Sequence, residues 1–118
     1  MAINSRQKGK RGELELAHEL NKYGYSTRRS QQYAGINNDA DVVGLPNIHI
    51  ECKRVEKLNL DQALDQAIRD AAEGEVPVVM HRKSRQKWRV TMPMKEFMEF
   101  YQAWEREMLS KAEKADVE

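Results

Sequence analysis

Two acidic residues and a lysine have a spacing that could support metal-assisted chemistry on a phosphate ester. Asp41 and Glu51 are separated by nine residues, and Lys53 follows Glu51 by two. Two carboxylates that lie close together bind a hard divalent cation through oxygen. The cation would polarise the phosphate and acidify a bound water, while the lysine would position that water or stabilise charge in the transition state. The alternative for so short a pattern is an exposed ion pair between strands, worth well under ~1 kcal/mol.

A strand over residues 48–53 would present Glu51 and Lys53 side by side. Residues two apart on a strand point to the same face, so the segment divides into a polar and an apolar face. A glycine and a proline favour a reversal before it, which joins it to an expected strand over residues 40–43 that carries Asp41. Their register decides whether Asp41 reaches Glu51, and the sequence leaves it open. The polar face holds His49, Glu51 and Lys53, and the apolar face holds Ile48, Ile50 and Cys52.

A third carboxylate, Glu13, belongs to a helix expected over residues 10–23. It lies three and four residues before Leu16 and Ala17, so it points toward the core side of that helix. A buried carboxylate is costly unless a cation meets it, and a metal or Lys53 would be that cation. The alternative is a glutamate of the first helical turn, favoured there by the helix dipole.

The remaining elements predict the fold class. Residues 60–72 have the clearest helical periodicity, with Gln62 and Gln66 beside the apolar stripe, where either could reach a water or phosphate or simply be solvated. Strands are expected over residues 25–30, 76–80 and 88–91, and a loop over 31–38. The order of helix, three strands, helix, two strands and helix predicts an α/β fold, with a mixed sheet of about five strands flanked by helices.

The two ends of the chain carry further expectations. Residues 1–9 are expected to form a basic arm, and residues 111–118 to fray. The last helix begins near Pro93 and carries an apolar stripe that would either pack in the core or form a subunit interface. The stripe consists of Met94, Phe97, Met98, Tyr101, Trp104, Met108 and Leu109.

Length and composition exclude several classes of protein. The 118 residues predict one globular domain, and 40% hydrophobic with 33% charged residues argues against disorder. No apolar stretch is long enough for a membrane span, and no secretory signal is visible. Cys52 is the only cysteine, which excludes an internal disulfide and a cysteine-ligated zinc site and suits a reducing compartment. His49 shares the face of Glu51, where it has a secondary role near the site or is a solvated strand histidine.

The net charge of +1 hides an asymmetry along the chain. Residues 93–118 carry four basic and seven acidic side chains, so the preceding residues sum to +4. Two basic clusters could form a phosphate-binding surface or two solvated faces. They are Arg6, Lys8, Lys10 and Arg11 near the start, and Arg82, Lys83, Arg85, Lys87 and Arg89 later.

The combination and order of these motifs over residues 6–91 resembles the PD-(D/E)xK nucleases. Within that group the chain is most similar to the archaeal-type Holliday junction resolvases and their phage relatives. The motifs that carry the resemblance are Lys8-Gly9 and Glu13 opening a helix, Arg29-Ser30, Asp41-Val42-Val43, Ile50-Glu51-Cys52-Lys53, a helix with Gln66, Val76-Pro77-Val78-Val79 and Trp88-Arg89-Val90.

The resemblance implies a restriction-endonuclease-like fold and a cytoplasmic endodeoxyribonuclease, in a prokaryotic or phage-infected cell, that acts in DNA recombination and repair. A homodimer would cleave two strands of a four-way DNA junction with Mg²⁺, for which Mn²⁺ can substitute. By motif, Glu13, Asp41 and Glu51 would hold the metal, and Lys53, Ser30 and Gln66 would complete the catalytic set. Asp39 and Gln62 are the alternatives to Asp41 and Gln66. The DNA contacts would come from Lys8, Lys10, Arg11, Arg29, Arg54, Arg82, Lys83, Arg85 and Lys87.

Two other functions fit the same residues. The nuclease could act on another DNA substrate, such as a flap, a nick or a restriction-type sequence. The chain could also be a DNA-binding protein of the same fold that does not cut. Clustered carboxylates repel DNA phosphates, so the set of Glu13, Asp41 and Glu51 argues against a purely binding role.

Overall fold

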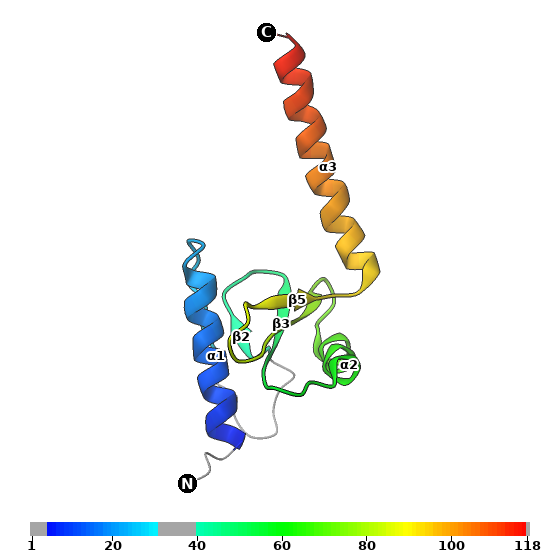
Figure 1. The fold of residues 1–118 in the computed structure, drawn as a ribbon. Coiled ribbons are helices and arrows are strands. Elements are labelled where there is room, and N and C mark those ends of the chain that lie inside the picture. The colour runs from blue at the N-terminus through cyan, green and yellow to red at the C-terminus, as the bar shows by residue number, and fades with distance from the viewer. Residues whose placement is uncertain (1–4, 31–39, 118) are drawn as a thin grey trace.

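The computed structural model of the chain describes residues 5–30 and 40–117 (Figure 1). Five strands form one sheet in the order β1-β2-β3-β4-β5. The expected α/β fold, with a mixed five-stranded sheet and flanking helices, is confirmed. In chain order the elements are α1 (Ser5–Asn21), β1 (Arg28–Arg29), β2 (Val42–Val43), β3 (Ile48–Arg54), α2 (Leu60–Asp70), β4 (Val76–Arg82), β5 (Arg89–Thr91) and α3 (Met94–Val117).

The two long strands β3 and β4 lie side by side at the centre of the sheet. They run parallel, with Ile50 opposite Val78, and α2 makes the crossover between them. Every other neighbouring pair of strands is antiparallel. A parallel pair needs such a crossover, and its strands are buried on both faces. Because β3 is central and covered on both sides, its polar side chains are buried as well as its apolar ones.

The two faces of the sheet are covered differently. The face under α1 holds the main core, in which Leu16 and Ile50 are fully buried and contribute about 1.5–3 kcal/mol each. The face under α2 holds a small apolar cluster of Ala63, Ala67 and Val79. This cluster is small because two of its three residues are alanines of α2. The polar residues of β3 lie on the same face of the sheet. The main core consists of Leu16, Ala17, Val42, Ile50, Cys52, Val78 and Met80.

Two glycines permit the close approaches that hold this arrangement. A Cβ atom on Gly12 of α1 would lie 2.6 Å from the Cβ of Arg54, so the helix can cross the end of β3 only with hydrogen at that position. Gly44 has φ +124°, and a Cβ there would lie 2.7 Å from the Cα of Thr27. Both glycines are therefore required by packing against a neighbouring segment.

The N-terminal helix is longer than its periodicity predicted. It begins at Ser5 instead of residue 10, so the basic run that includes Lys8 is helical. Arginine, lysine and glutamine are good helix formers, and single glycines such as Gly9 cost only about 1 kcal/mol each. β1 is shorter than the predicted strand over residues 25–30. The predicted loop over residues 31–38 and the alternative Asp39 lie outside the described residues.

The last helix, α3, extends away from the sheet, and the molecule measures 65 Å along its longest axis (Figure 1). Its apolar stripe is exposed, with Trp104 at 57% and Leu109 at 58% of their full accessibility. The interpretation of this stripe as core is therefore wrong, because the helix leaves the edge strand β5 and points outward. The helix also continues through residues 111–117, where alanine, glutamate and lysine favour it and Lys111 pairs with Glu107 at 3.7 Å.

Candidate active site

The pairing of β2 with β3 brings Asp41, the residue before β2, next to Glu51. Val42 pairs with Ile50 in this antiparallel ladder, and the Asp41 N–H donates to the Ile50 carbonyl at 2.9 Å. On the other side, the Ser30 N–H donates to the Asp41 carbonyl at 3.0 Å. Ser30, Asp41 and Glu51 therefore form a row across three neighbouring chain segments.

The Asp41 and Glu51 carboxyl groups lie within hydrogen-bonding reach of each other. Burial, and then the neighbouring Asp41 carboxylate, raise the pKa of Glu51 to about 8, while Lys53 acts in the opposite direction. The Cys52 N–H donates to Asp41 Oδ2 at 2.8 Å and fixes that side chain. Two buried carboxylates this close need a shared proton or a cation. The buried Glu51 Oε2 has no hydrogen-bond partner, and this donor set fits a divalent metal.

Glu13 is half-buried and its carboxylate is met by an arginine. The Arg29 Nε atom lies 2.9 Å from Glu13 Oε1, so an arginine that the sequence analysis did not pair with Glu13 also meets this group. Burial and Asp41 raise the pKa of Glu13, while Arg29 and Lys53 lower it. Glu13 therefore lies within electrostatic reach of Asp41 and Lys53. The guanidinium is the closer cation because β1, at the sheet edge, brings Arg29 under α1.

A histidine and a further aspartate join Glu51 on the α2 face. Among residues 5–30 and 40–117, His49, Glu51 and Asp70 are the group of three potential ligands whose donor atoms lie within 4.8 Å of one another. Glu13 is not in that group. His49 is 2% exposed, so its interpretation as a solvated strand histidine is wrong. Sequence reasoning missed Asp70, although its spacing of three residues from Ala67 places it on the buried side of α2.

Comparison with known proteins identifies the family. The sequence profile of a family described as "Phage putative PDDEXK endonuclease" matches residues 4–117. The chain belongs to this family of endonucleases. The letters D, E and K in the family name PDDEXK fit Asp41, Glu51 and Lys53 in that order. The pairing of β2 with β3 brings these three residues together.

The fold of the endonuclease also occurs in a solved structure. That structure is Archaeoglobus fulgidus Hjc, a Holliday junction resolvase from an archaeal hyperthermophile. The two are 24% identical, with a TM-score of 0.55, over 70% of this chain and 74% of that chain. At this identity the similarity shows the shared fold. None of the curated proteins compared with the endonuclease matches it, and no helix within its described ranges is both long and apolar enough to cross a bilayer.

Two of the other residues predicted for the site, Lys53 and Ser30, lie near the carboxylates of the endonuclease. The charge of Lys53 lowers the pKa values of both Glu13 and Glu51, so its ammonium group is within electrostatic reach of both. Ser30 is buried beside Asp41. Gln66 is half-buried on α2, whereas Gln62 is exposed, so burial favours Gln66 over its alternative.

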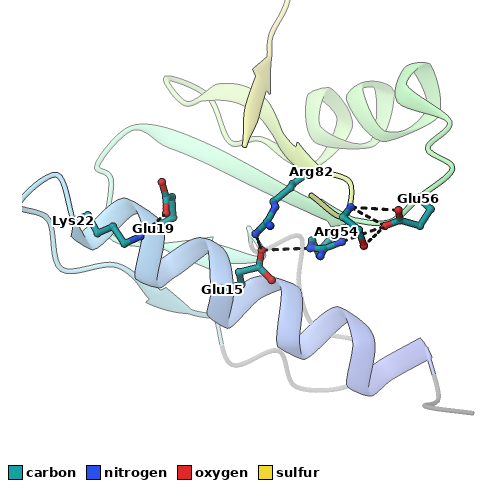
Figure 2. Close-up of polar contacts among 7 residues, drawn as sticks. Glu15, Glu19, Lys22, Arg54, Glu56 and Arg82 are labelled. Atoms are coloured by element: carbon teal, nitrogen blue, oxygen red, sulfur yellow. Dashed lines mark hydrogen bonds and ion pairs between the residues drawn. The ribbon is translucent and has the colours of Figure 1, made fainter. Parts of the chain in front are cut away.

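Three of the predicted DNA-contacting arginines have acidic partners within the chain. Figure 2 shows Arg54 and Arg82 converging on Glu15 of α1, and Arg54 Nε lies 3.3 Å from Glu15 Oε1. Arg54 also pairs with Glu56 at 3.3 Å, and the third arginine, Arg29, pairs with Glu13. These pairs join α1 to the ends of β3 and β4. The other predicted DNA contacts are exposed: Lys8, Lys10, Arg11, Lys83, Arg85 and Lys87.

Proposed function

We propose that the endonuclease hydrolyses DNA phosphodiester bonds with a divalent cation, Mg²⁺ or Mn²⁺, held by Asp41 and Glu51. The observation that carries this proposal is the pairing of β2 with β3, which brings the two carboxylates within hydrogen-bonding reach, with Lys53 two residues further on the same strand face. When bound there, the cation would supply Lewis acidity toward the phosphate and lower the pKa of water.

The protein's own residues would orient this reaction. The Lys53 ammonium group would stabilise negative charge on the phosphate or hold the attacking water. Asp41 is pre-oriented by the Cys52 N–H, so its carboxylate needs no rearrangement to bind a cation. Ser30 lies beside Asp41 at the sheet edge, and Ser30 together with Gln66 of α2 would position the phosphate. Glu13 would act indirectly, through its ion pair with Arg29 and through the effect of its own negative charge on the neighbouring groups.

The proposed substrate is a four-way DNA junction. The shared fold with a Holliday junction resolvase and the exposed lysines and arginines of α1 and the β4–β5 turn support it. Exposed cationic side chains release counterions when they neutralise DNA phosphates, which makes such binding favourable and salt-dependent. We place this activity in the cytoplasm of a prokaryotic or phage-infected cell, in DNA recombination or repair.

A homodimer is part of the same proposal. A four-way junction has two symmetric strands to cut, and one chain carries one carboxylate row. The exposed stripe of α3 offers a surface for the second copy, because a lone helix with a wide apolar face is unstable in water. We propose that α3 pairs with α3 of a second copy, with Phe97, Tyr101 and Trp104 at the contact.

One assay separates the candidate substrates. Labelled four-way junction, linear duplex and flap DNA are incubated with the protein in Mg²⁺ or in EDTA. Symmetric cleavage of the junction alone, abolished by EDTA, is the expected result. Comparable cleavage of duplex or flap would replace the junction with another DNA substrate. Binding of DNA without cleavage in Mg²⁺ or Mn²⁺ would overturn the nuclease proposal.

A further inference from the structure

We propose that His49, Glu51 and Asp70 form a site for a first-row transition-metal ion, with the His49 imidazole as a direct ligand. The site shares Glu51 with the carboxylate pair described above, and so rests in part on the proposed function. It differs from that pair by its nitrogen donor and by the contribution of α2. The occupant it favours is Mn²⁺ or a similar ion in preference to Mg²⁺.

The first argument is the geometry of the donors. Two of the three residues are neighbours on one face of β3, and Asp70 comes from α2 above them. One ligand atom from each lies within 4.8 Å of the other two, a spacing that one ion can bridge. Imidazole suits transition metals, whereas all-oxygen donor sets suit Mg²⁺. The mixture of one nitrogen with two carboxylates therefore favours a first-row transition-metal ion, such as Mn²⁺, over Mg²⁺.

The second argument is the lack of partners for two buried atoms. His49 is 2% exposed and Glu51 is 4% exposed, yet neither His49 Nε2 nor Glu51 Oε2 has a hydrogen-bond partner. A buried polar atom without a partner has lost its hydrogen bonds to water and gained none in the fold, which is destabilising. Coordination of one ion by both atoms would satisfy both.

The third argument is the second ring nitrogen of His49. The Nδ1 atom lies 3.7 Å from Glu75 Oε1, and that oxygen accepts a 2.8 Å hydrogen bond from the Ala72 N–H, which holds it in place. A carboxylate beside one ring nitrogen is the usual arrangement for a histidine whose other nitrogen binds a metal. It orients the ring so that Nε2 is the ligand.

The position of Asp70 adds a fourth argument. A carboxylate at the C-terminal end of a helix is opposed by the helix dipole, and Asp70 is the last residue of α2. Its carboxylate also lies close to that of Glu51, and the two like charges repel each other. His49, Asp70 and Glu75 line a surface cleft of about 650 Å³, through which an ion can enter. A bound cation would offset both unfavourable charge effects.

Metal binding is tested on the complete protein without DNA. Titration calorimetry with Mn²⁺ and with Mg²⁺ compares the wild type with His49→Gln and Asp70→Asn. We expect each substitution to weaken Mn²⁺ binding by about tenfold or more, and His49→Gln to leave Mg²⁺ binding nearly unchanged. Asp65→Asn on the exposed side of α2 and His18→Gln on α1 are matched controls, and both should bind Mn²⁺ as the wild type does.

A spectroscopic measurement identifies the ligand in the wild type itself. Pulsed electron paramagnetic resonance of bound Mn²⁺ should show coupling to a ¹⁴N nucleus, which is lost in His49→Gln. If His49→Gln does not fold, the wild-type spectrum and the Mn²⁺ affinity of Asp70→Asn still test the proposed site. A wild-type spectrum without nitrogen coupling, or Asp70→Asn binding Mn²⁺ as tightly as the wild type, would overturn this site.

The two proposals can fail separately. Mg²⁺-dependent cleavage of DNA by a protein that shows no nitrogen coupling would remove the histidine site and leave the nuclease. Nitrogen coupling in a protein that cuts no DNA would keep the metal site and remove the nuclease.

Discussion

Asp41 and Glu51 are held together in spite of their charges. Burial and mutual repulsion raise the pKa of Glu51 to about 8, so the metal-free protein stabilises the protonated form of this side chain. Carboxyl groups with a raised pKa of this kind concentrate at functional sites. A structural ion pair would instead favour the charged form of the carboxyl group. The fold thus bears an unfavourable interaction at the place where the proposed cation would relieve it.

Substitution of the aspartate tests the proposed role directly. Asp41→Asn should lower the cleavage rate by about 100-fold or more, since it removes a proposed cation ligand and its charge. DNA binding should be equal or tighter, because one charge that repels phosphate is gone. Single-turnover cleavage and a binding titration measure the two effects. Asp65→Asn, an exposed change of the same chemistry on α2, should alter neither, and full cleavage by Asp41→Asn would refute the assignment.

The pH dependence of stability follows from the pKa of Glu51. That pKa is raised in the folded state, so its contribution to stability is complete below about pH 4.5 and is lost as the pH rises through about 8. Glu51→Gln does not titrate and avoids this loss. In EDTA the variant should therefore gain on the wild type, by on the order of 4 kcal/mol between pH 5 and pH 8.5. Urea unfolding at the two pH values measures the difference, and a constant difference would contradict the shift.

At the scale of elements, the site depends on how closely α1 crosses the end of β3. Gly12 permits that contact, and Glu15, one turn later on the helix, receives Arg54 and Arg82 from the two central strands. Thr27 fixes a later part of α1, where its Oγ1 donates to the Ala17 carbonyl at 3.0 Å. The helix that carries Glu13 is thus anchored against the sheet at its middle and toward its C-terminal end.

Two alanine substitutions in α1 should have opposite effects. Gly12→Ala places a methyl group against the Arg54 Cβ and should destabilise the fold by about 1–3 kcal/mol. Gly9→Ala meets nothing within 4 Å and should stabilise the same helix by about 0.5–1 kcal/mol. Chemical denaturation of both variants gives the comparison. Equal effects of the two changes would show that α1 does not pack closely on β3.

At the scale of the whole molecule, the sheet with α1 and α2 forms a body from which α3 extends (Figure 1). The large side chains of α3 are exposed along its length, including Phe97, Tyr101 and Trp104. Tyr101 and Trp104 contact each other with ring centroids 5.7 Å apart, which gathers the aromatic surface on one side of the helix. A surface of this kind is typical of a contact with another molecule.

The homodimer proposal predicts that α3 controls the state of association. Trp104→Glu should shift the protein from dimer to monomer, because it places a charge in the apolar contact. Ser110→Glu adds the same charge on the opposite side of the same helix and should leave the dimer intact. Sedimentation velocity over a range of concentrations measures both variants. A wild type that remains a monomer at all concentrations would contradict the proposal.

The sequence alone determined the fold class and which faces of α1 and β3 enter the main core, and it predicted the carboxylates of the proposed site. The alternation of β3 and the apolar periodicity of α2 are local patterns, and burial of apolar surface makes them reliable. Asp41, Glu51 and Lys53 could be named because their order and spacing match a known motif. The same local logic explains why Cys52 was expected in the core and is buried there.

The tertiary structure decided which side chains meet. The register that brings Asp41 next to Glu51 depends on pairing between strands, and a slip of one residue would have turned Asp41 to the other face. Arg29 reaches Glu13, and Asp70 reaches His49, across long stretches of sequence for which local periodicity has no signal. The exposure of α3 was equally inaccessible, because an apolar stripe has the same pattern whether its partner is the same chain or another.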